Sequence, residues 1–204
     1  MAIIESKTPL RERPKHDHYE TPVKVARSAM RLLARDHSLP RQPRILDAGA
    51  GKGPWGIAVK DVLPSAVLHG IELEEKFKQP WHYANWFTDD FLAWDHRKSG
   101  LPAYDLVIGN PPFKLAADFV RQAHDSVKEG GYVFFLLKLA FLEGVKRGKG
   151  LYVQYPLHDI WFSMRRISFF RTAKSSTNDI AFALFLWRKG ASGDFKWWDH
   201  QDGG

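Results

Sequence analysis

The chain has 204 residues, carries 30 Lys and Arg against 23 Asp and Glu, and contains no cysteine. This length suits one domain with a substantial core, and the lack of cysteine excludes disulfides, thiolate metal sites and cysteine nucleophiles. No stretch has the apolar length of a membrane span, the nine histidines are scattered, and the amino-terminal segment lacks the apolar part of a secretion signal. We therefore expect a soluble intracellular protein that binds neither a metal nor a membrane.

The first predicted element is a helix. Residues 1–14 are polar and punctuated by proline, which predicts a mobile tail ahead of one domain at 15–190. Thr21-Pro22 is typical of an N-cap followed by a first helical residue, and apolar residues then repeat at helical spacing to about Asp36.

A glycine-rich turn follows the first predicted strand. The strand Arg44–Ala48 runs into Gly49-Ala50-Gly51-Lys52-Gly53, and the next helix covers Trp55–Leu63. Glycine lets the backbone turn tightly and pass close beneath a ligand, because it has no side chain to clash. The spacing differs from the dinucleotide fingerprint, since Pro54 stands where the third glycine belongs, and this disfavours NAD.

The next two strands each end in a carboxylate. Glu72 lies at the end of the strand Val67–Leu73, where it could accept both ribose hydroxyls of a nucleoside. A helix is predicted over Glu74–Ala84 despite its proline, and a short edge strand over Trp86–Phe91. Asp90 at the end of that strand could receive an adenine amino group while Phe91 covers the ring. Alone, each carboxylate could be a surface residue or a turn cap, but their succession predicts a nucleoside cofactor.

A buried strand is predicted over Tyr104–Gly109, and Asn110-Pro111-Pro112-Phe113 follows it directly. An amine conjugated to a ring or carbonyl is a poor nucleophile, and an amide oxygen plus a backbone carbonyl can accept its two hydrogens and free its lone pair. Proline holds such carbonyls in a rigid turn, and the following aromatic ring offers a face for a flat base. A plain Pro-Pro turn requires neither the preceding Asn nor the following aromatic residue.

The remaining elements complete an α/β pattern. They are a helix Leu115–Val127, a Gly130-Gly131 turn into the strand Tyr132–Leu139, and a last strand pair near Ile160–Arg166 and Ile180–Arg188. Strands separated by helices predict a parallel, doubly wound sheet, and the closing pair predicts an antiparallel hairpin at one edge. Ligands in such sheets bind beyond the carboxyl ends of the strands. Residues 191–204 form a polar tail.

Basic residues gather in the last third of the chain. The segment Lys138–Lys189 holds ten Lys and Arg and three Asp and Glu, which accounts for the net charge of +7. A solvated face is one explanation, but the aromatic residues interleaved within Arg165–Arg171 favour nucleic acid, because phosphates attract cations and unstacked bases stack on rings.

Taken together, these motifs resemble S-adenosylmethionine-dependent N6-adenine DNA methyltransferases of the gamma order, and the later segments are similar to small phage-borne members. The resemblance covers about Tyr19–Lys189 and implies a Rossmann-like class I methyltransferase fold in a bacterial or phage-infected cytoplasm. The cofactor residues that it implies are Tyr19, Thr21, Pro22, Asp47, Ala48, Gly49, Gly51, Gly53, Glu72, Leu73, Asp90, Phe91 and Asn110.

The same resemblance implies direct methyl transfer to a flipped-out adenine. The Asn110 oxygen and the Pro111 carbonyl would accept the amine hydrogens, Phe113 would stack on the base, and Phe169 would be a second stacking ring with Phe170 and Phe141 behind it. With Phe169, the predicted nucleic-acid-binding residues are Arg165, Arg166, Arg171, Lys174, Lys146, Arg147 and Lys149. No separate target-recognition domain is evident, so we expect a relaxed or short sequence preference read by residues 143–156 and 167–178.

Several alternatives stay open at the level of sequence. The same loop serves enzymes that methylate adenine in RNA, the N4 amine of cytosine or the side-chain amide of glutamine, so DNA is favoured mainly by the family resemblance. A non-catalytic subunit is disfavoured because both the cofactor motifs and the catalytic loop are intact. A dehydrogenase has no use for the Asn-Pro-Pro-Phe loop.

Overall fold

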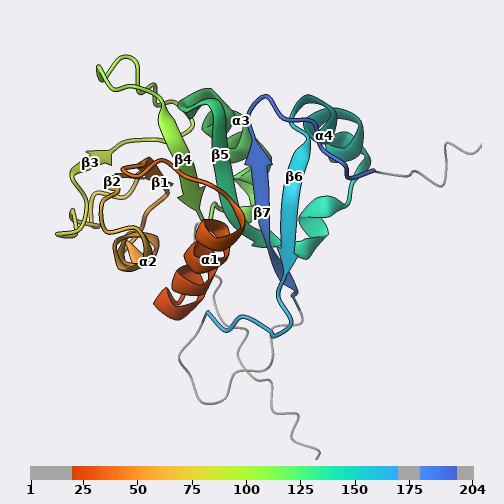
Figure 1. Cartoon of the computed structure of the whole chain (residues 1–204), viewed down its shortest axis with the longest axis horizontal. Coiled ribbons are helices and arrows are strands. Elements are labelled where there is room, and N and C mark those ends of the chain that lie inside the picture. Colours follow the sequence, from red (N-terminus) through yellow and green to blue (C-terminus); the bar gives the residue numbers. More distant parts are fainter. Residues whose placement is uncertain (1–19, 170–179, 197–204) are drawn as a thin grey trace, which may run out of the picture.

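The computed structural model describes residues 20–169 and 180–196, and within them a single sheet dominates (Figure 1). Its strands are β1 Arg44–Ala48, β2 Val67–Glu72, β3 Asn85–Thr88, β4 Tyr104–Gly109, β5 Val127–Lys138, β6 Leu157–Phe162 and β7 Phe182–Arg188. They are hydrogen-bonded in the order β3-β2-β1-β4-β5-β7-β6. The strand order reverses between β1 and β4, which is where ligands bind in doubly wound sheets.

The pairing of the strands confirms the predicted fold class. β1 pairs in parallel with β2 and β4, β2 with β3, and β4 with β5. β7 runs antiparallel to both β5 and β6, so the closing pair forms an antiparallel hairpin at the edge of the sheet. All the parallel strands therefore end at the same edge, which lies at the bottom of Figure 1.

Helices cover both faces of the sheet. The longer ones are α1 Val23–Asp36, α2 Pro54–Val62 and α3 Ala116–Ser126, and short helical turns occupy Phe113–Leu115, Leu139–Leu142, Arg147–Leu151 and α4 Tyr152–Gln154. Alternate residues of a strand point to opposite faces. In β4, Leu106 and Ile108 accordingly pack with α1 and α2, while Val107 packs with α3. None of the helices in the described ranges is long and apolar enough to span a bilayer.

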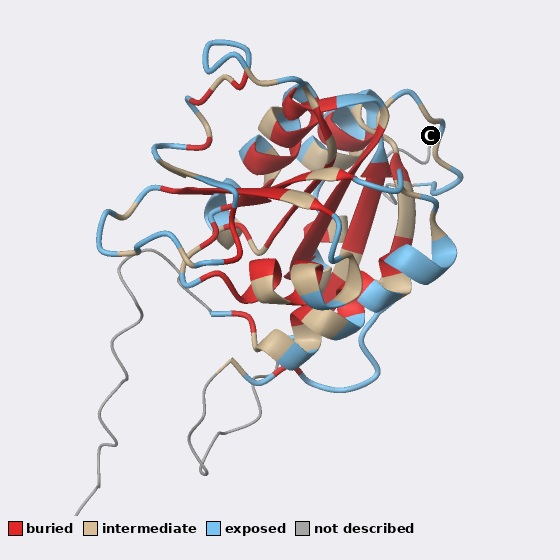
Figure 2. Cartoon of the chain, turned by 60° about the vertical axis from the view of Figure 1, so that its left-hand side comes forward, coloured by how far each residue is buried: buried red, intermediate tan, exposed pale blue. Residues whose placement is uncertain are grey.

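The central strands are nearly continuous apolar runs because both of their faces are covered. β1 and β4 are buried along almost their whole length, and Figure 2 shows the buried residues concentrated in the strands and in the inner faces of the helices. This is the pattern that parallel sheets require. The predicted bounds of α1, β1 and β4 are confirmed to within one residue.

The helix predicted over Glu74–Ala84 is wrong, because this segment consists of turns. The amide of Phe77 bonds to the carbonyl of Glu74, and that of Tyr83 to the carbonyl of Pro80, so each bond closes a single tight turn. Proline removes one donor from any helix here. The Tyr83 ring is 4% exposed and packs in the core, and this burial decides the local conformation.

The predicted Gly130-Gly131 turn is also wrong. β5 begins at Val127 and continues through both glycines, with Gly130 at a φ of +74°. The register with β4 shifts between Tyr104 and Leu106, so the extra residues are accommodated as a bulge within the strand. The sequence pattern predicted the part of β5 that follows the two glycines, but not the part of β5 that precedes them.

Candidate active site

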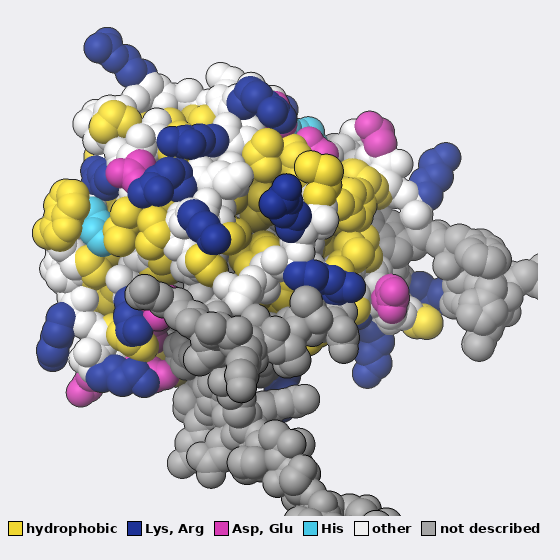
Figure 3. Space-filling model, turned by 90° about the horizontal axis from the view of Figure 1, so that it is seen from below, with side chains coloured by type: hydrophobic (Ala, Val, Ile, Leu, Met, Phe, Trp, Pro, Cys, Tyr) yellow, Lys and Arg dark blue, Asp and Glu magenta, His cyan; other side chains and the backbone are white. Residues whose placement is uncertain are grey.

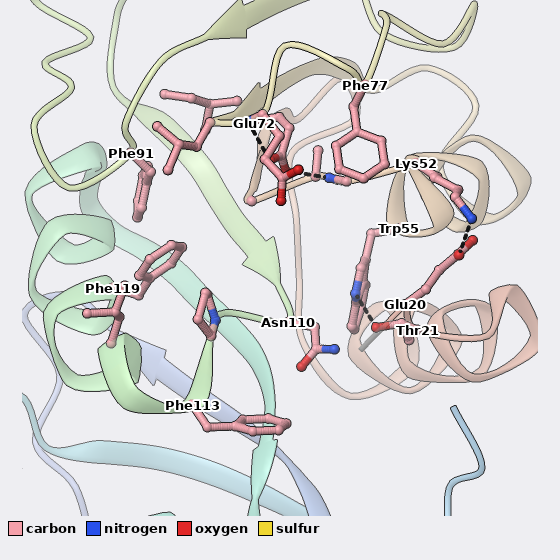
Figure 4. Close-up of a pocket in the computed structure, with 18 of the residues that line it drawn as sticks. Glu20, Thr21, Lys52, Trp55, Glu72, Phe77, Phe91, Asn110, Phe113 and Phe119 are labelled. Atoms are coloured by element: carbon pink, nitrogen blue, oxygen red, sulfur yellow. Dashed lines mark hydrogen bonds and ion pairs between the residues drawn. The ribbon is translucent and has the colours of Figure 1, made fainter. Parts of the chain in front are cut away.

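A cavity of about 900 Å³ opens at the carboxyl ends of the parallel strands (Figure 4). Residues from both motifs predicted from sequence line it: Thr21, Gly49, Gly51, Glu72, Leu73, Asp90, Phe91, Asn110, Pro112 and Phe113. The cofactor motif and the Asn-Pro-Pro-Phe loop therefore share one space. Such a volume is at the upper end of what small-molecule sites of roughly 300–1,000 Å³ offer.

The glycine-rich turn forms one wall of the cavity. Gly49 and Gly51 have φ values of +70° and +55°, in the left-handed region that favours glycine. The amides of Gly49 and Ala50 donate to the carbonyl of Ile71 at 2.9 and 3.0 Å, which fastens the turn to the end of β2. The backbone is thus exposed to the cavity while its position is fixed.

Glu72 is held at the end of β2 by two backbone donors. The amide of Gly51 donates to Oε2 at 2.8 Å and the amide of Glu74 to Oε1 at 3.0 Å, and the side chain is almost fully buried. A carboxylate offers about four acceptor positions, so two remain after these bonds. The site can therefore accept two neighbouring hydroxyl groups from a ligand in the cavity.

Asp47 lies beneath the glycine-rich turn and does not line the cavity. It is completely buried, and the Tyr83 hydroxyl donates to its Oδ2 at 2.5 Å. Burial raises the pKa of the Asp47 carboxyl to about 7, and burial likewise raises the pKa of Tyr83 well above its usual range. Asp47 thus supports the turn from below. Pro22, Ala48, Gly53 and Pro111 are also absent from the cavity lining, and Tyr19 lies outside the described residues.

The turn after β3 supplies the opposite wall. Asp90 lies at the cavity, and its Oδ1 also accepts the amide of Leu92 at 2.9 Å, so the same side chain caps the turn. Phe91 is buried, and its ring centroid lies 5.0 Å from that of Phe119 on α3. These two rings, tilted by 47° to one another, give the cavity an apolar aromatic side (Figure 4).

Several lining residues were missed by the sequence analysis. The indole of Trp55 at the start of α2 donates to the Thr21 hydroxyl at 3.3 Å, and Lys52 of the glycine-rich turn pairs with Glu20 at 2.8 Å. These two contacts tie the segment before α1 to the turn and to α2. Phe77, Phe119, Lys138 and Ile180 also line the cavity. Trp55 could have been predicted from the sequence, because it is the aromatic residue just after the glycine-rich turn. The other lining residues are brought to the cavity by tertiary packing.

The Asn-Pro-Pro-Phe loop leaves β4 immediately beside the glycine-rich turn. A Cβ added to Gly109 would lie 2.6 Å from the carbonyl oxygen of Ala48, so only glycine lets the two strand ends approach this closely. The amide of Leu115 donates to the Pro112 carbonyl at 2.9 Å and closes the turn that leads into α3. Asn110 and Phe113 point into the cavity, with Asn110 between Phe113 and the Glu72 side (Figure 4).

The Phe113 ring contacts two residues from the last part of the sheet. The Lys138 ammonium lies 4.0 Å from its centroid, and the Phe182 ring centroid lies 5.6 Å away. Phe169 contacts Phe182 at 4.9 Å and is not among the cavity-lining residues. Phe141, expected near Phe169, instead packs in the other core cluster beside Phe185, and Phe170 lies outside the described residues.

The predicted nucleic-acid-binding residues fall into distinct places. Arg165 and Arg166 are exposed just after β6, whereas the Arg147 guanidinium donates to the carbonyls of Phe141 and Ala140 at 2.8 and 3.3 Å and so holds its own segment together. Lys146 and Lys149 flank Arg147 and are exposed, while Arg171 and Lys174 lie outside the described residues. In Figure 3, viewed from below Figure 1, Lys and Arg side chains are interspersed with hydrophobic ones.

Among the residues that the structure describes, no group of three His, Asp or Glu could hold a metal ion.

No family model matches the chain. Similar solved structures include a Listeria monocytogenes protein assigned to the class I S-adenosylmethionine-dependent methyltransferases, with a TM-score of 0.64 and 16% identity over 86% of this chain and 62% of that one. A Pyrococcus horikoshii protein assigned as an RNA methyltransferase has a TM-score of 0.62 and 16% identity over 90% and 94%. The plantazolicin methyltransferase BpumL, solved with SAH, has a TM-score of 0.54 and 13% identity over 82% and 83%.

These likenesses establish a Rossmann-like class I methyltransferase fold, as the sequence predicted. The chain spans only about three fifths of the length of the Listeria protein.

Proposed function

We propose that the protein is an S-adenosylmethionine-dependent methyltransferase that modifies the N6 amine of adenine in DNA. One observation carries this proposal: the Asn-Pro-Pro-Phe loop and the glycine-rich turn with Glu72 line the same cavity. Methyl transfer to a conjugated amine requires that the methyl donor and the groups that activate the amine lie in the same cavity.

The cofactor end of the cavity suits a cationic nucleoside. Glu72, Asp89 and Asp90 line it, together with Glu20, which pairs with Lys52, and Glu74, which pairs with Lys76. Glu72 has acceptor capacity for ribose hydroxyls, and the aromatic wall of Phe91 and Phe119 suits an adenine ring. Class I methyltransferases of similar fold, one of them solved with SAH, support S-adenosylmethionine as the cofactor.

The chemistry needs few protein groups. S-adenosylmethionine, held at Glu72 and the glycine-rich turn, would supply an electrophilic methyl group to the substrate nitrogen and would leave as the neutral thioether. The Asn110 oxygen accepts one hydrogen of the substrate amine. The carbonyl of Pro111, which lies in the chain between the lining residues Asn110 and Pro112, accepts the other, so the lone pair is directed away from the ring. Positioning of this kind is effective because the donors and acceptors are fixed before the reaction. The nitrogen then releases one proton to solvent.

Adenine in a nucleic acid is favoured by the surroundings of the loop. A flat base extruded from its stack needs an aromatic surface to offset the lost stacking, and Phe113 lines the cavity for this purpose. The exposed Arg165 and Arg166 can pair with phosphates. RNA is the second candidate substrate, because the similar Pyrococcus horikoshii protein, which this chain matches over 94% of its length, is assigned as an RNA methyltransferase.

The test is direct. The whole chain is incubated with methyl-labelled S-adenosylmethionine and separate pools of unmethylated DNA, RNA and protein, each of which is digested afterwards. We expect the label in N6-methyl-2′-deoxyadenosine. Label in N4-methylcytosine or in glutamine would replace adenine as the substrate, and label only in RNA would favour the second candidate.

A further inference from the structure

Lys138 occupies the position on Phe113 where a substrate base is proposed to stack. It is the last residue of β5, and its backbone is in register with Phe182 of β7. The half-buried side chain reaches back, so that Nζ lies 4.0 Å from the Phe113 ring centroid. Lys138, Phe113 and Asn110 all line the cavity, and from this we infer that the ring face beneath the ammonium is the face turned to the cavity.

This position is incompatible with an inserted base. A stacked base and an ammonium group cannot both occupy one ring face. In addition, methyl transfer moves positive charge from the donor onto the amine nitrogen, and a second positive charge a few ångströms away would disfavour that change. The Lys138 ammonium must therefore leave the Phe113 face before the reaction.

The displaced ammonium needs a better partner than the ring. Among the described residues Lys138 makes no ion pair, and its contact with Phe113 is a cation–π interaction of modest strength. A phosphate oxygen forms a stronger, charge-assisted hydrogen bond, and the four-carbon side chain lets the ammonium move without any shift of β5. A nucleotide that brings a base to Phe113 also brings a phosphate to the mouth of the same cavity.

We propose that Lys138 is a positioning residue that exchanges the Phe113 ring for a backbone phosphate of the target nucleotide, and thereby selects nucleotides within a strand over other conjugated amines. The inference rests on the proposed function and deepens it. A free nucleoside or a glutamine side chain has no phosphate to draw the ammonium away. Only a nucleic acid strand both uncovers the stacking face and satisfies the displaced charge.

The test compares variants of Lys138 with a matched control. Lys138→Met removes the charge and keeps the length, Lys138→Arg keeps the charge, and Lys98→Met removes an exposed charge from the turn ahead of β4, at the opposite edge of the sheet. The value of kcat/KM for an adenine-containing oligonucleotide is measured over a series of salt concentrations. Free adenosine is assayed in parallel.

We expect Lys138→Met to lower kcat/KM for the oligonucleotide about tenfold, as loss of one charge-assisted contact predicts. It should also reduce the magnitude of the slope of log kcat/KM against log salt by about 1, the change expected when one phosphate contact is lost. Activity on adenosine should increase, because the stacking face is then no longer covered by an ammonium group, and an unchanged activity would count against the proposal. Lys138→Arg and Lys98→Met should keep the parental slope.

A measurement on the unaltered protein does not depend on the folding of any variant. A neutral methylphosphonate linkage at the target nucleotide should lower kcat/KM of the parental protein about tenfold and leave that of Lys138→Met unchanged. The role of Lys138 would be overturned if Lys138→Met kept the parental salt slope. It would also be overturned if the parental protein had the same kcat/KM for the substrate with the neutral linkage as for the unmodified substrate. Failure of the parental protein to methylate any nucleic acid would instead overturn the proposed function.

Discussion

The two halves of the cavity are built in different ways. In the half formed by the ends of β1, β2 and β3, backbone amides fix the decisive group, since Gly51 and Glu74 both donate to Glu72. In the half formed by β4, β5 and β7, side chains hold the Phe113 ring in place, since Lys138 and Phe182 both contact it. A rigid backbone cradle suits a cofactor that is the same in every turnover, whereas the proposed substrate base, which would enter and leave, requires side chains that can move.

The largest expected effect tests the side-chain half. Asn110→Ala removes one acceptor for the substrate amine, and loss of one such contact typically lowers kcat by about 10²–10³. Because Asn110 is proposed to act mainly on the substrate, the affinity for S-adenosylmethionine measured by calorimetry should remain nearly unchanged. Asn85→Ala, an exposed amide on β3, is the control. Parental turnover in Asn110→Ala would refute the catalytic assignment.

The backbone half is tested by Glu72→Gln. The amide nitrogen that replaces one carboxylate oxygen cannot accept a hydrogen bond, so it would face either the Gly51 or the Glu74 amide. We expect the Kd for S-adenosylmethionine to rise about 10- to 100-fold, as loss of a hydrogen bond to a charged group predicts. Glu75→Gln, exposed on the same segment, should bind like the parental chain. Equal affinity of both variants would exclude Glu72 from the cofactor site.

The junction between the halves depends on Gly109. In Gly109→Ala the new methyl group would meet the Ala48 carbonyl oxygen at 2.6 Å, and such overpacking typically costs about 1–3 kcal/mol. Denaturant unfolding should reveal this loss, and cofactor affinity and turnover should fall together because both strand ends shift. Gly150→Ala, where an added Cβ meets nothing within 4 Å, should unfold like the parental chain. Equal stability of the two variants would contradict the close approach of β1 and β4.

The last prediction concerns pH and the support beneath the glycine-rich turn. Because burial raises the pKa of Asp47 from 3.8 to about 7, folding favours the protonated carboxyl, and its contribution to stability is present below about pH 4 and lost as the pH rises through about 7. Asp47→Asn keeps an acceptor for Tyr83 and does not titrate. The free energy of unfolding of the parental chain, measured relative to Asp47→Asn, should therefore fall between pH 4 and 7. A constant difference would show that Asp47 is not buried as described.

The comparison also explains what the sequence could predict. The strands β1 and β4, the Gly-x-Gly-x-Gly turn, Glu72 and the Asn-Pro-Pro-Phe loop are encoded by neighbouring residues, so composition and spacing located them. The contact between Phe113 and Lys138 joins residues 25 positions apart and exists only because β5 lies beside β4. Local patterns carry no record of such pairs.

The segment Glu74–Ala84 shows that local patterns can also predict an element that is absent from the structure. Its composition allows a helix, but Tyr83 is needed beneath the glycine-rich turn, where its hydroxyl reaches Asp47, 36 residues away in the chain. Tertiary burial therefore overrides local propensity. Arg165 and Arg166, which charge singled out, are exposed after β6, whereas the hydrogen bonds of Arg147 to backbone carbonyls could not be predicted from charge alone.

The central claim is that a methyl donor and a conjugated amine meet in the cavity between Glu72 and Phe113. Incubation of the whole chain with methyl-labelled S-adenosylmethionine and unmethylated DNA, followed by digestion to nucleosides, tests it most directly. The account predicts labelled N6-methyl-2′-deoxyadenosine from the parental chain and almost none from Asn110→Ala. Absence of label from every nucleic acid offered, or labelling that persists undiminished in Asn110→Ala, would contradict it.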